Sequence, residues 1–142
     1  MKRIIGIIVS ALICLGVLSC QKDGYPEGAD LTSLRVAVVP APSSIPAAGA
    51  TFEAAVVVNQ GPYRDVPWTV SVDGDLEWVS VTKIRYTSHF TGTYAGDDTD
   101  VEQDGISCTL SVNDTGRKRL ANLRFTTADG RSIIYTVTQL AK

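Results

Sequence analysis

Apolar and polar residues alternate along most of this chain, in short runs separated by turn residues. Alternation with a period of two places every second side chain on the same face of a strand, whereas an amphipathic helix needs a period near 3.6 residues. Because no stretch keeps the helical period over three turns, the pattern predicts a protein built almost entirely from strands. The predicted strands are residues 34–39, 51–58, 67–72, 78–84, 106–112, 119–127 and 132–139.

Turn residues stand between these strands. Asp73-Gly74 and Asp129-Gly130 provide residues that tolerate positive φ angles, which tight hairpins need. Many short strands separated by such turns are typical of two packed antiparallel sheets. We therefore expect an all-β fold, an antiparallel β-sandwich of about seven strands.

The two tryptophans flank the first of these turns. The indole of Trp68 shares a face with the valines of the same strand, which predicts that Trp68 lies in the core. Trp78 has the opposite parity from the valines that follow it. Two interpretations of Trp78 stay open: partial burial at the end of the sandwich, or an exposed aromatic surface for a ligand.

The N-terminus has the features of a bacterial lipoprotein signal. Basic residues precede an apolar segment, residues 4–18, that is short for a membrane span and suits a signal peptide. The sequence Val17-Leu18-Ser19-Cys20 resembles a lipobox, in which the cysteine is lipidated on sulfur and becomes the new N-terminus. An ordinary secretory signal with a chance cysteine is the alternative.

These features divide the chain into three expected parts. Residues 1–19 are the signal peptide, and residues 20–33 are a polar tether that begins at the lipidated Cys20. Residues 34–142 are the β-sandwich domain. We expect an outer-membrane lipoprotein of a bacterial cell envelope, held at the membrane by its lipid anchor only. Exposure on the cell surface and a periplasmic location both stay open.

Charge and residue content argue against several classes of function. The formal net charge is −2, so the basic field that nucleic-acid binding needs is missing. Beyond Cys20, Cys108 is the single cysteine, which excludes an internal disulfide and a cysteine-based zinc site in the domain. His89 is the single histidine, and its neighbour Ser88 points the opposite way in an extended segment. We therefore expect a protein that is not an enzyme, with no catalytic residues and no cofactor.

Several short motifs, taken in order, resemble a known family. They are Ile45-Pro-Ala-Ala-Gly49, Trp68-Thr-Val, Trp78-Val-Ser-Val, Ser111-Val-Asn113, Arg119-Leu-Ala121 and Tyr135-Thr-Val-Thr-Gln139. Their order and spacing over about residues 34–140 resemble the BACON domain, the Bacteroidetes-associated carbohydrate-binding often N-terminal domain. The resemblance implies an immunoglobulin-like β-sandwich on a secreted or surface protein of Bacteroidetes, with a proposed role in binding carbohydrate. The roles expected for the shared residues are structural.

A long insertion, residues 85–105, departs from the family pattern. A structureless loop of about 20 residues in a compact domain is uncommon and often functional. An extra hairpin around Thr91-Gly92 is the alternative. The insertion combines aromatic rings, which can stack on sugars, with polar groups that can bond them. The candidate ligand-binding residues are Tyr86, His89, Phe90 and Tyr94, together with Trp78. Stapling of the loop onto the sandwich and contact with a partner protein are the other interpretations of these aromatic residues.

The same insertion carries a run of acids. Carboxylate oxygens are the ligands that calcium prefers, but the spacing here lacks the order of an EF-hand. A solvated acidic loop is the favoured interpretation, and we expect no metal. The calcium candidates, if there were a site, are Asp97, Asp98, Asp100 and Asp104.

Two functions from different classes remain after these exclusions. The leading hypothesis is a non-catalytic, lipid-anchored binding module of the cell envelope that recognises glycan. The alternative is a structural spacer or an accessory subunit of a surface protein complex.

Overall fold

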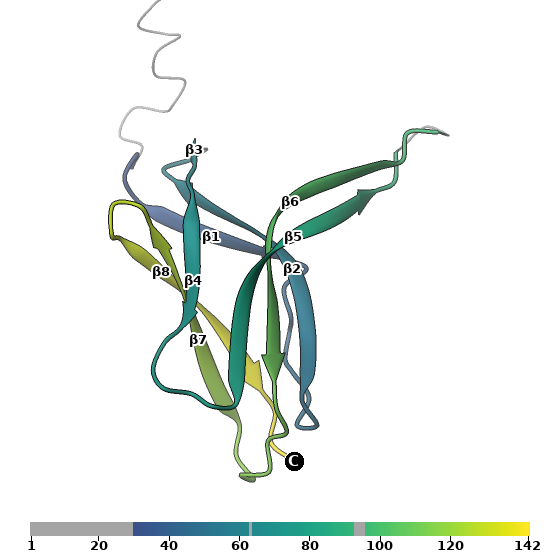
Figure 1. The fold of residues 1–142 in the computed structure, drawn as a ribbon, viewed down its shortest axis with the longest axis vertical. Helices are drawn as coiled ribbons and strands as arrows, with labels where there is room; N and C mark the ends of the chain where they lie inside the picture. Colours follow the sequence, from purple (N-terminus) through teal and green to yellow (C-terminus); the bar gives the residue numbers. More distant parts are fainter. Residues whose placement is uncertain (1–29, 63, 93–95) are drawn as a thin grey trace, which may run out of the picture. The chain divides into compact units, whose positions relative to one another are not determined.

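The computed structural model describes residues 30–62, 64–92 and 96–142, which form eight strands and no helix. The strands are β1 (Leu34–Val39), β2 (Ala50–Gln60), β3 (Arg64–Asp65), β4 (Trp68–Val72), β5 (Val79–Phe90), β6 (Thr99–Leu110), β7 (Arg119–Thr127) and β8 (Ser132–Gln139). One antiparallel sheet has the order β1-β2-β6-β5, with β3 paired to β2, and the other has the order β4-β7-β8 (Figure 1). The predicted β-sandwich is therefore confirmed, with the two-residue β3 as an addition.

Both sheets lie within the unit Thr32–Lys142. The expected signal peptide, Cys20 and most of the tether fall in residues 1–29, outside the described residues. Within the described part of the chain, no helix has the length and apolar character needed to cross a membrane.

The core lies between the two sheets and follows the alternation of the sequence. Every second residue of β2 and β6 points inward, and Ala54, Ile106 and Cys108 have no exposed surface. Trp68 is 5% exposed and meets the ring of Phe125 edge-on, with centroids 5.2 Å apart. The prediction that Trp68 fills the core is therefore confirmed. Cys108, on the inward face of β6, is buried as well, and burial raises the pKa of its thiol to about 11.

The insertion is where the structure differs most from the expectation of a loop. β5 runs on to Phe90 and β6 already begins at Thr99, with pairs from Arg85↔Asp104 to Phe90↔Thr99. A structureless loop is thus wrong for most of residues 85–105, and the alternative of a hairpin is confirmed. The physical reason is that period-two alternation continues through the insertion, with aromatic residues on one face and charged residues on the other.

We call the paired residues 85–90 and 99–104 the arm. β2 pairs with β6 only as far as Ala55↔Gly105, so among the described residues the arm consists of two strands without a third. Figure 1 shows the arm turning away from β1 and β2. Gly105 stands at this bend, where a Cβ would lie 2.4 Å from the carbonyl oxygen of Ala54 and 2.6 Å from Cβ of Tyr86. Glycine therefore lets Tyr86 cross β6 at the base of the arm.

Candidate functional site

A groove of about 380 Å³ lies on the outer face of the five-stranded sheet, at the base of the arm. Its floor comes from β1 and β2, where the register pairs Ala37 with Val57 and Val39 with Ala55. These residues point away from the core because their neighbours along each strand point into it. The sequence pattern thus produces an apolar floor on the solvent side of the sheet.

Aromatic side chains of the arm border this floor. Tyr86 and Phe90 lie four residues apart on β5, so both stand on the same face of the strand. Tyr86 is partly buried, whereas Phe90 is 52% exposed. Val39, which also lines the groove, is 62% exposed. The groove is therefore open to solvent beside an accessible ring.

Polar groups of the arm complete the groove. Gln103 donates a hydrogen bond from Nε2 to Oγ of Ser88 over 2.7 Å, and both residues line the groove. His89 also lines it, and its Nδ1 lies 2.5 Å from Oδ1 of Asp100. The lining contains neither lysine nor arginine among the described residues. The site can therefore offer hydrogen bonds and aromatic contact, with little positive charge.

The structure brings together three of the five candidate ligand-binding residues. Tyr86, His89 and Phe90 line one groove, as the position of the insertion suggested. Tyr94 lies outside the described residues. Trp78 lies before the first residue of β5, and the twelve-residue strand separates it from Phe90. Trp78 therefore does not contribute to this groove.

Trp78 belongs instead to a cluster at the opposite end of β5, which we call the polar latch (Trp78, Asn113, Arg119 and Gln139). The guanidinium carbon of Arg119 lies 4.0 Å from the centroid of the Trp78 ring, and the ring is partly buried against the core. This arrangement matches the interpretation of Trp78 as a partly buried structural residue. One face of its indole is covered by a cation rather than open to a ligand.

Two buried amides anchor the polar latch. Gln139 has no exposed surface; it donates to the carbonyl oxygens of Ser111 and Pro46 and accepts from Nε of Arg119 over 2.8 Å. Asn113 is equally buried and donates to the carbonyl oxygens of Arg117 and Leu140. These bonds join three separate chain segments. All four residues of the latch belong to the motifs on which the family resemblance was based, and here they stabilise the fold.

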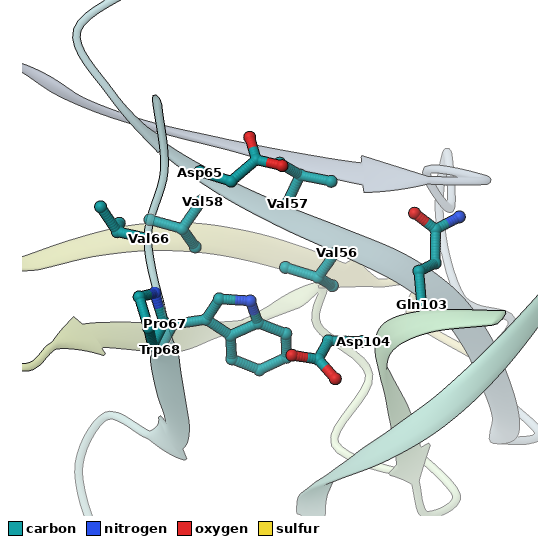
Figure 2. Close-up of a pocket in the computed structure, with 9 residues that line it drawn as sticks. All are labelled: Val56, Val57, Val58, Asp65, Val66, Pro67, Trp68, Gln103 and Asp104. Carbon is teal, nitrogen blue, oxygen red and sulfur yellow. The ribbon is translucent and has the colours of Figure 1, made fainter. Parts of the chain in front are cut away.

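A second hollow, of about 330 Å³, opens between β2, β6 and the segment that joins β3 to β4. Figure 2 shows the indole of Trp68 next to Val56 of β2 and the carboxylate of Asp104, with Asp65 farther from the indole, near Val57. Val57 and Gln103 line both this hollow and the outer-face groove. The two hollows therefore meet where β6 separates from β2.

Charged groups surround the Trp68 hollow. Lys83 places Nζ 4.2 Å from the centroid of the Trp68 ring and donates to the carbonyl oxygen of that residue over 2.9 Å. Asp104 lies 2.9 Å from Nη1 of Arg85 and 3.2 Å from Nζ of Lys83. The hydrogen bond from Arg85, and then that from Lys83, hold the pKa of the Asp104 carboxyl below its usual range.

Sequence analysis missed the Trp68 hollow. Its residues come from three separate stretches of the chain, 56–58, 65–68 and 103–104, and none of these stretches marks a site by its own pattern. The one available signal was that Lys83 and Arg85 occupy the positions where apolar alternation of the fourth predicted strand gives way to charge. That signal does not show which strands surround the charges.

The calcium candidates are not gathered into a site. Within the described residues, no three histidine, cysteine, aspartate or glutamate residues come together to hold a metal ion. Asp100 and Asp104 are four residues apart on an extended strand, a separation of roughly 13 Å. Each is paired with a different residue of β5, His89 and Arg85 respectively. Asp97 and Asp98, which precede β6, are exposed.

Comparison with known proteins gives little to add to this geometry. No protein-family model matches the chain, and no curated protein matches it. Among solved structures, the chain is similar to a GH5 xyloglucanase of Bacteroides ovatus in complex with a XXXG heptasaccharide, at 21% identity and a TM-score of 0.47. The match covers 78% of this chain and 19% of that chain, so this protein spans about a fifth of the xyloglucanase.

Proposed function

We propose that this protein is a non-catalytic, lipid-anchored binding module of the bacterial cell envelope that recognises glycan in the outer-face groove. The observation that carries the proposal is the placement of Tyr86 and Phe90 on the same face of β5, with Ser88 and Gln103 in the same lining. Sugars present apolar ring faces and hydroxyl groups, and this lining offers partners for both. Its volume is within the roughly 300–1,000 Å³ of typical ligand sites.

The spacing and charge of the lining narrow the class of glycan. Tyr86 and Phe90 are separated by four residues of extended strand, or roughly 13 Å, which exceeds one sugar ring. A ligand that contacts both rings is therefore an oligosaccharide. Because the described residues that line the groove include no lysine or arginine, a carboxylate or sulfate on the sugar would find no lysine or arginine partner among them. The groove thus favours a neutral oligosaccharide.

The anchor is the second part of the proposal. The lipobox-like sequence before Cys20 supports lipidation of that cysteine, and the resemblance to the BACON domain supports an envelope protein of Bacteroidetes. A tether over residues 20–33 would allow the groove to stay clear of the lipid surface.

A glycan array tests the binding proposal. The protein is expected to retain neutral oligosaccharides, with affinity rising from the monosaccharide to longer chains. Phe90→Ala and Tyr86→Ala are expected to weaken binding about tenfold or more, because each removes one stacking surface. Leu120→Ala is the matched control, since Leu120 is an exposed apolar residue of the three-stranded sheet. Absence of all glycan binding by the wild type would overturn the proposal.

An accessory role in a surface complex is the second candidate. The observation in its favour is that the arm leaves strand edges without partners in the described part of the chain. An open edge is a common site for pairing with another protein. Glycan binding that is lost in Phe90→Ala favours the first candidate, whereas capture of a protein strand without any glycan binding favours the second.

A further inference from the structure

The five-stranded sheet divides at Gly105. From Ala50 to Ala55, β2 pairs with β6, and there the pairing ends. Beyond that point β2 continues with β1 and β3, while β6 continues with β5 only. Figure 1 shows the two halves diverging, and the Trp68 hollow lies on the inner side of the gap between them. Residues 99–104 of β6 therefore have a strand on one side only, among the residues that the structure describes.

The free side of β6 presents backbone groups. In an antiparallel pair, every second residue turns its N–H and C=O away from the partner strand. Over residues 99–104 these groups point into the gap, and no backbone hydrogen bond from the described loops or turns reaches them. Six residues of edge are enough to pair with a strand of ordinary length.

We propose that this edge of β6 binds an extended segment of a partner protein as an added strand. The segment would carry basic residues on the face directed to the inner side of the sheet and apolar residues on the other face. The proposal goes beyond glycan recognition and does not depend on it, because backbone pairing at β6 supplies the contact.

The acids of β6 decide the charge of the partner. Asp100, Glu102 and Asp104 occupy alternate positions and share the inner face of the strand. Their partners lie on the β5 side: Lys83 and Arg85 pair with Asp104, and His89 pairs with Asp100. Glu102 takes part in none of the ion pairs among the described residues. A strand added on the opposite side would meet the acids first. Lysine or arginine directly across from them is favourable, and acidic residues are not.

The outward-facing residues beside the β6 edge indicate where the added strand would carry apolar residues. Val101 and Gln103 alternate with the acids and therefore face outward, and Val101 is 41% exposed. Val57 lies across the gap on β2 and lines both hollows. Apolar side chains of the added strand would cover Val101 and Val57. Alternation of basic and apolar residues is thus the partner pattern that fits this edge.

A second copy of this chain does not fit the same edge. Two copies related by a two-fold axis at Glu102 would pair their β6 strands in antiparallel register. That register places Asp100 of each copy opposite Asp104 of the other, and Glu102 opposite itself. Like charges directly opposite one another destabilise a strand pair. The row of acids therefore disfavours self-association through β6 and favours a basic partner strand.

A peptide-binding experiment tests the proposal on the full chain in detergent micelles. The probe is a fluorescent peptide of about eight residues that alternates lysine and valine. We expect saturable binding by fluorescence anisotropy, together with slower hydrogen exchange at the amides of residues 99–104. The same peptide methylated on every backbone nitrogen has lost its donors and is expected not to bind. A peptide that alternates glutamate and valine is also expected not to bind.

A pair of charge reversals locates the site. Glu102→Lys is expected to weaken lysine–valine peptide binding about five- to tenfold, because it replaces a favourable cross-strand pair with a repulsive one. Glu53→Lys is the matched control: Glu53 is exposed on the outer face of β2, where β2 still pairs with β6, and binding should change less than about twofold.

Three results would overturn the proposal. The first is equal binding of the methylated peptide, which would show attraction without strand pairing. The second is an equal loss of binding in Glu53→Lys and Glu102→Lys, which would show a general charge effect. The third is protection of residues 99–104 without peptide, accompanied by dimers in sedimentation or by no peptide binding, which would show that a second copy or another segment of this chain already covers the edge.

Discussion

The two ends of β5 use the same kinds of side chain in opposite ways. At the polar latch, Gln139 is fully buried with three hydrogen bonds, and Arg119 lies over an indole ring. In the arm, Gln103 is partly buried and bonds Ser88, while Arg85 has 61% of its side chain exposed beside Asp104. Each end thus combines an amide, a guanidinium and aromatic rings.

The difference lies in what surrounds these groups. Around the latch, two loops bring the backbone carbonyl oxygens of Pro46 and Ser111 within reach of the Gln139 amide nitrogen. A buried polar group is tolerated only when its bonds are complete, so this end is fixed in one arrangement. The arm has no such surroundings, and its polar and aromatic groups remain accessible. The comparison teaches that accessibility, rather than residue type, separates the structural end from the candidate binding end.

Matched glutamine substitutions at the two ends are expected to give the largest difference in the free energy of unfolding. Gln139→Ala is expected to lower the free energy of unfolding by roughly 3 kcal/mol, because it removes three hydrogen bonds and leaves buried partners unsatisfied. Gln103→Ala is expected to cost less than about 1 kcal/mol, since it loses a single bond near solvent. Urea denaturation of the unlipidated chain measures both. Similar losses in the two variants would show that the ends do not differ in the way described.

Matched arginine substitutions at the two ends are expected to give an intermediate difference in the free energy of unfolding. Arg119→Ala removes the contact with the Trp78 ring and the bonds to Gln139 and two backbone carbonyl oxygens, a loss of about 2 kcal/mol. Arg85→Ala removes an exposed ion pair and is expected to cost less than about 0.5 kcal/mol. Thermal unfolding of both variants checks the order. Greater destabilisation by Arg85→Ala would reverse the assignment of the structural end.

Lowering the pH is expected to give the smallest difference in stability between the two ends of β5. The pKa of Asp104 is lowered in the folded protein by Arg85 and Lys83, so its contribution to stability is complete above its unfolded pKa of about 3.9 and is lost as pH falls toward the lower folded pKa. Because this group is exposed, the loss is under about 1 kcal/mol. The latch contains no acid and keeps its bonds over the same range.

Amide hydrogen exchange between pH 5 and pH 2 measures the stability of the arm and of the latch separately. Exchange rates corrected for the intrinsic effect of pH should show the arm losing protection before the latch. Asp104→Asn should remove most of this pH dependence while leaving the latch unchanged. Simultaneous loss at both ends would mean that the arm and the latch unfold as one unit.

Strand positions in the sandwich were predictable because local alternation decides them. The strands expected at residues 34–39, 119–127 and 132–139 have the bounds found in the structure. Trp68 was placed in the core from parity alone, and it is buried. Most side chains that alternation places inward in these strands are apolar, and the buried polar exceptions, Thr127 and Gln139, stand at strand ends. Local pattern and global packing therefore agree along most of each strand.

The arm and its surroundings were less predictable. Residues 85–105 alternate like a strand, but their charged face gives no core to pack against, and a loop was the expectation from length. Tyr86 and Phe90 were chosen correctly as neighbours of a common surface, yet the floor of the groove comes from β1 and β2, far away in the sequence. The sequence left two roles for Trp78. The contact that distinguishes them comes from Arg119, 41 positions later in the chain, whose guanidinium lies over the Trp78 ring.

The sequence by itself determined the class of fold, the strand pattern and the absence of a disulfide within the domain, because each depends on residue type and short-range spacing. The tertiary structure decided where the five-stranded sheet divides, which polar groups are enclosed and which edge of β6 has no partner strand among the described residues. These depend on contacts between residues far apart in the chain, such as Gly105 against Ala54 and Gln139 against Pro46. Packing geometry sets such contacts, and no local pattern of residues contains it.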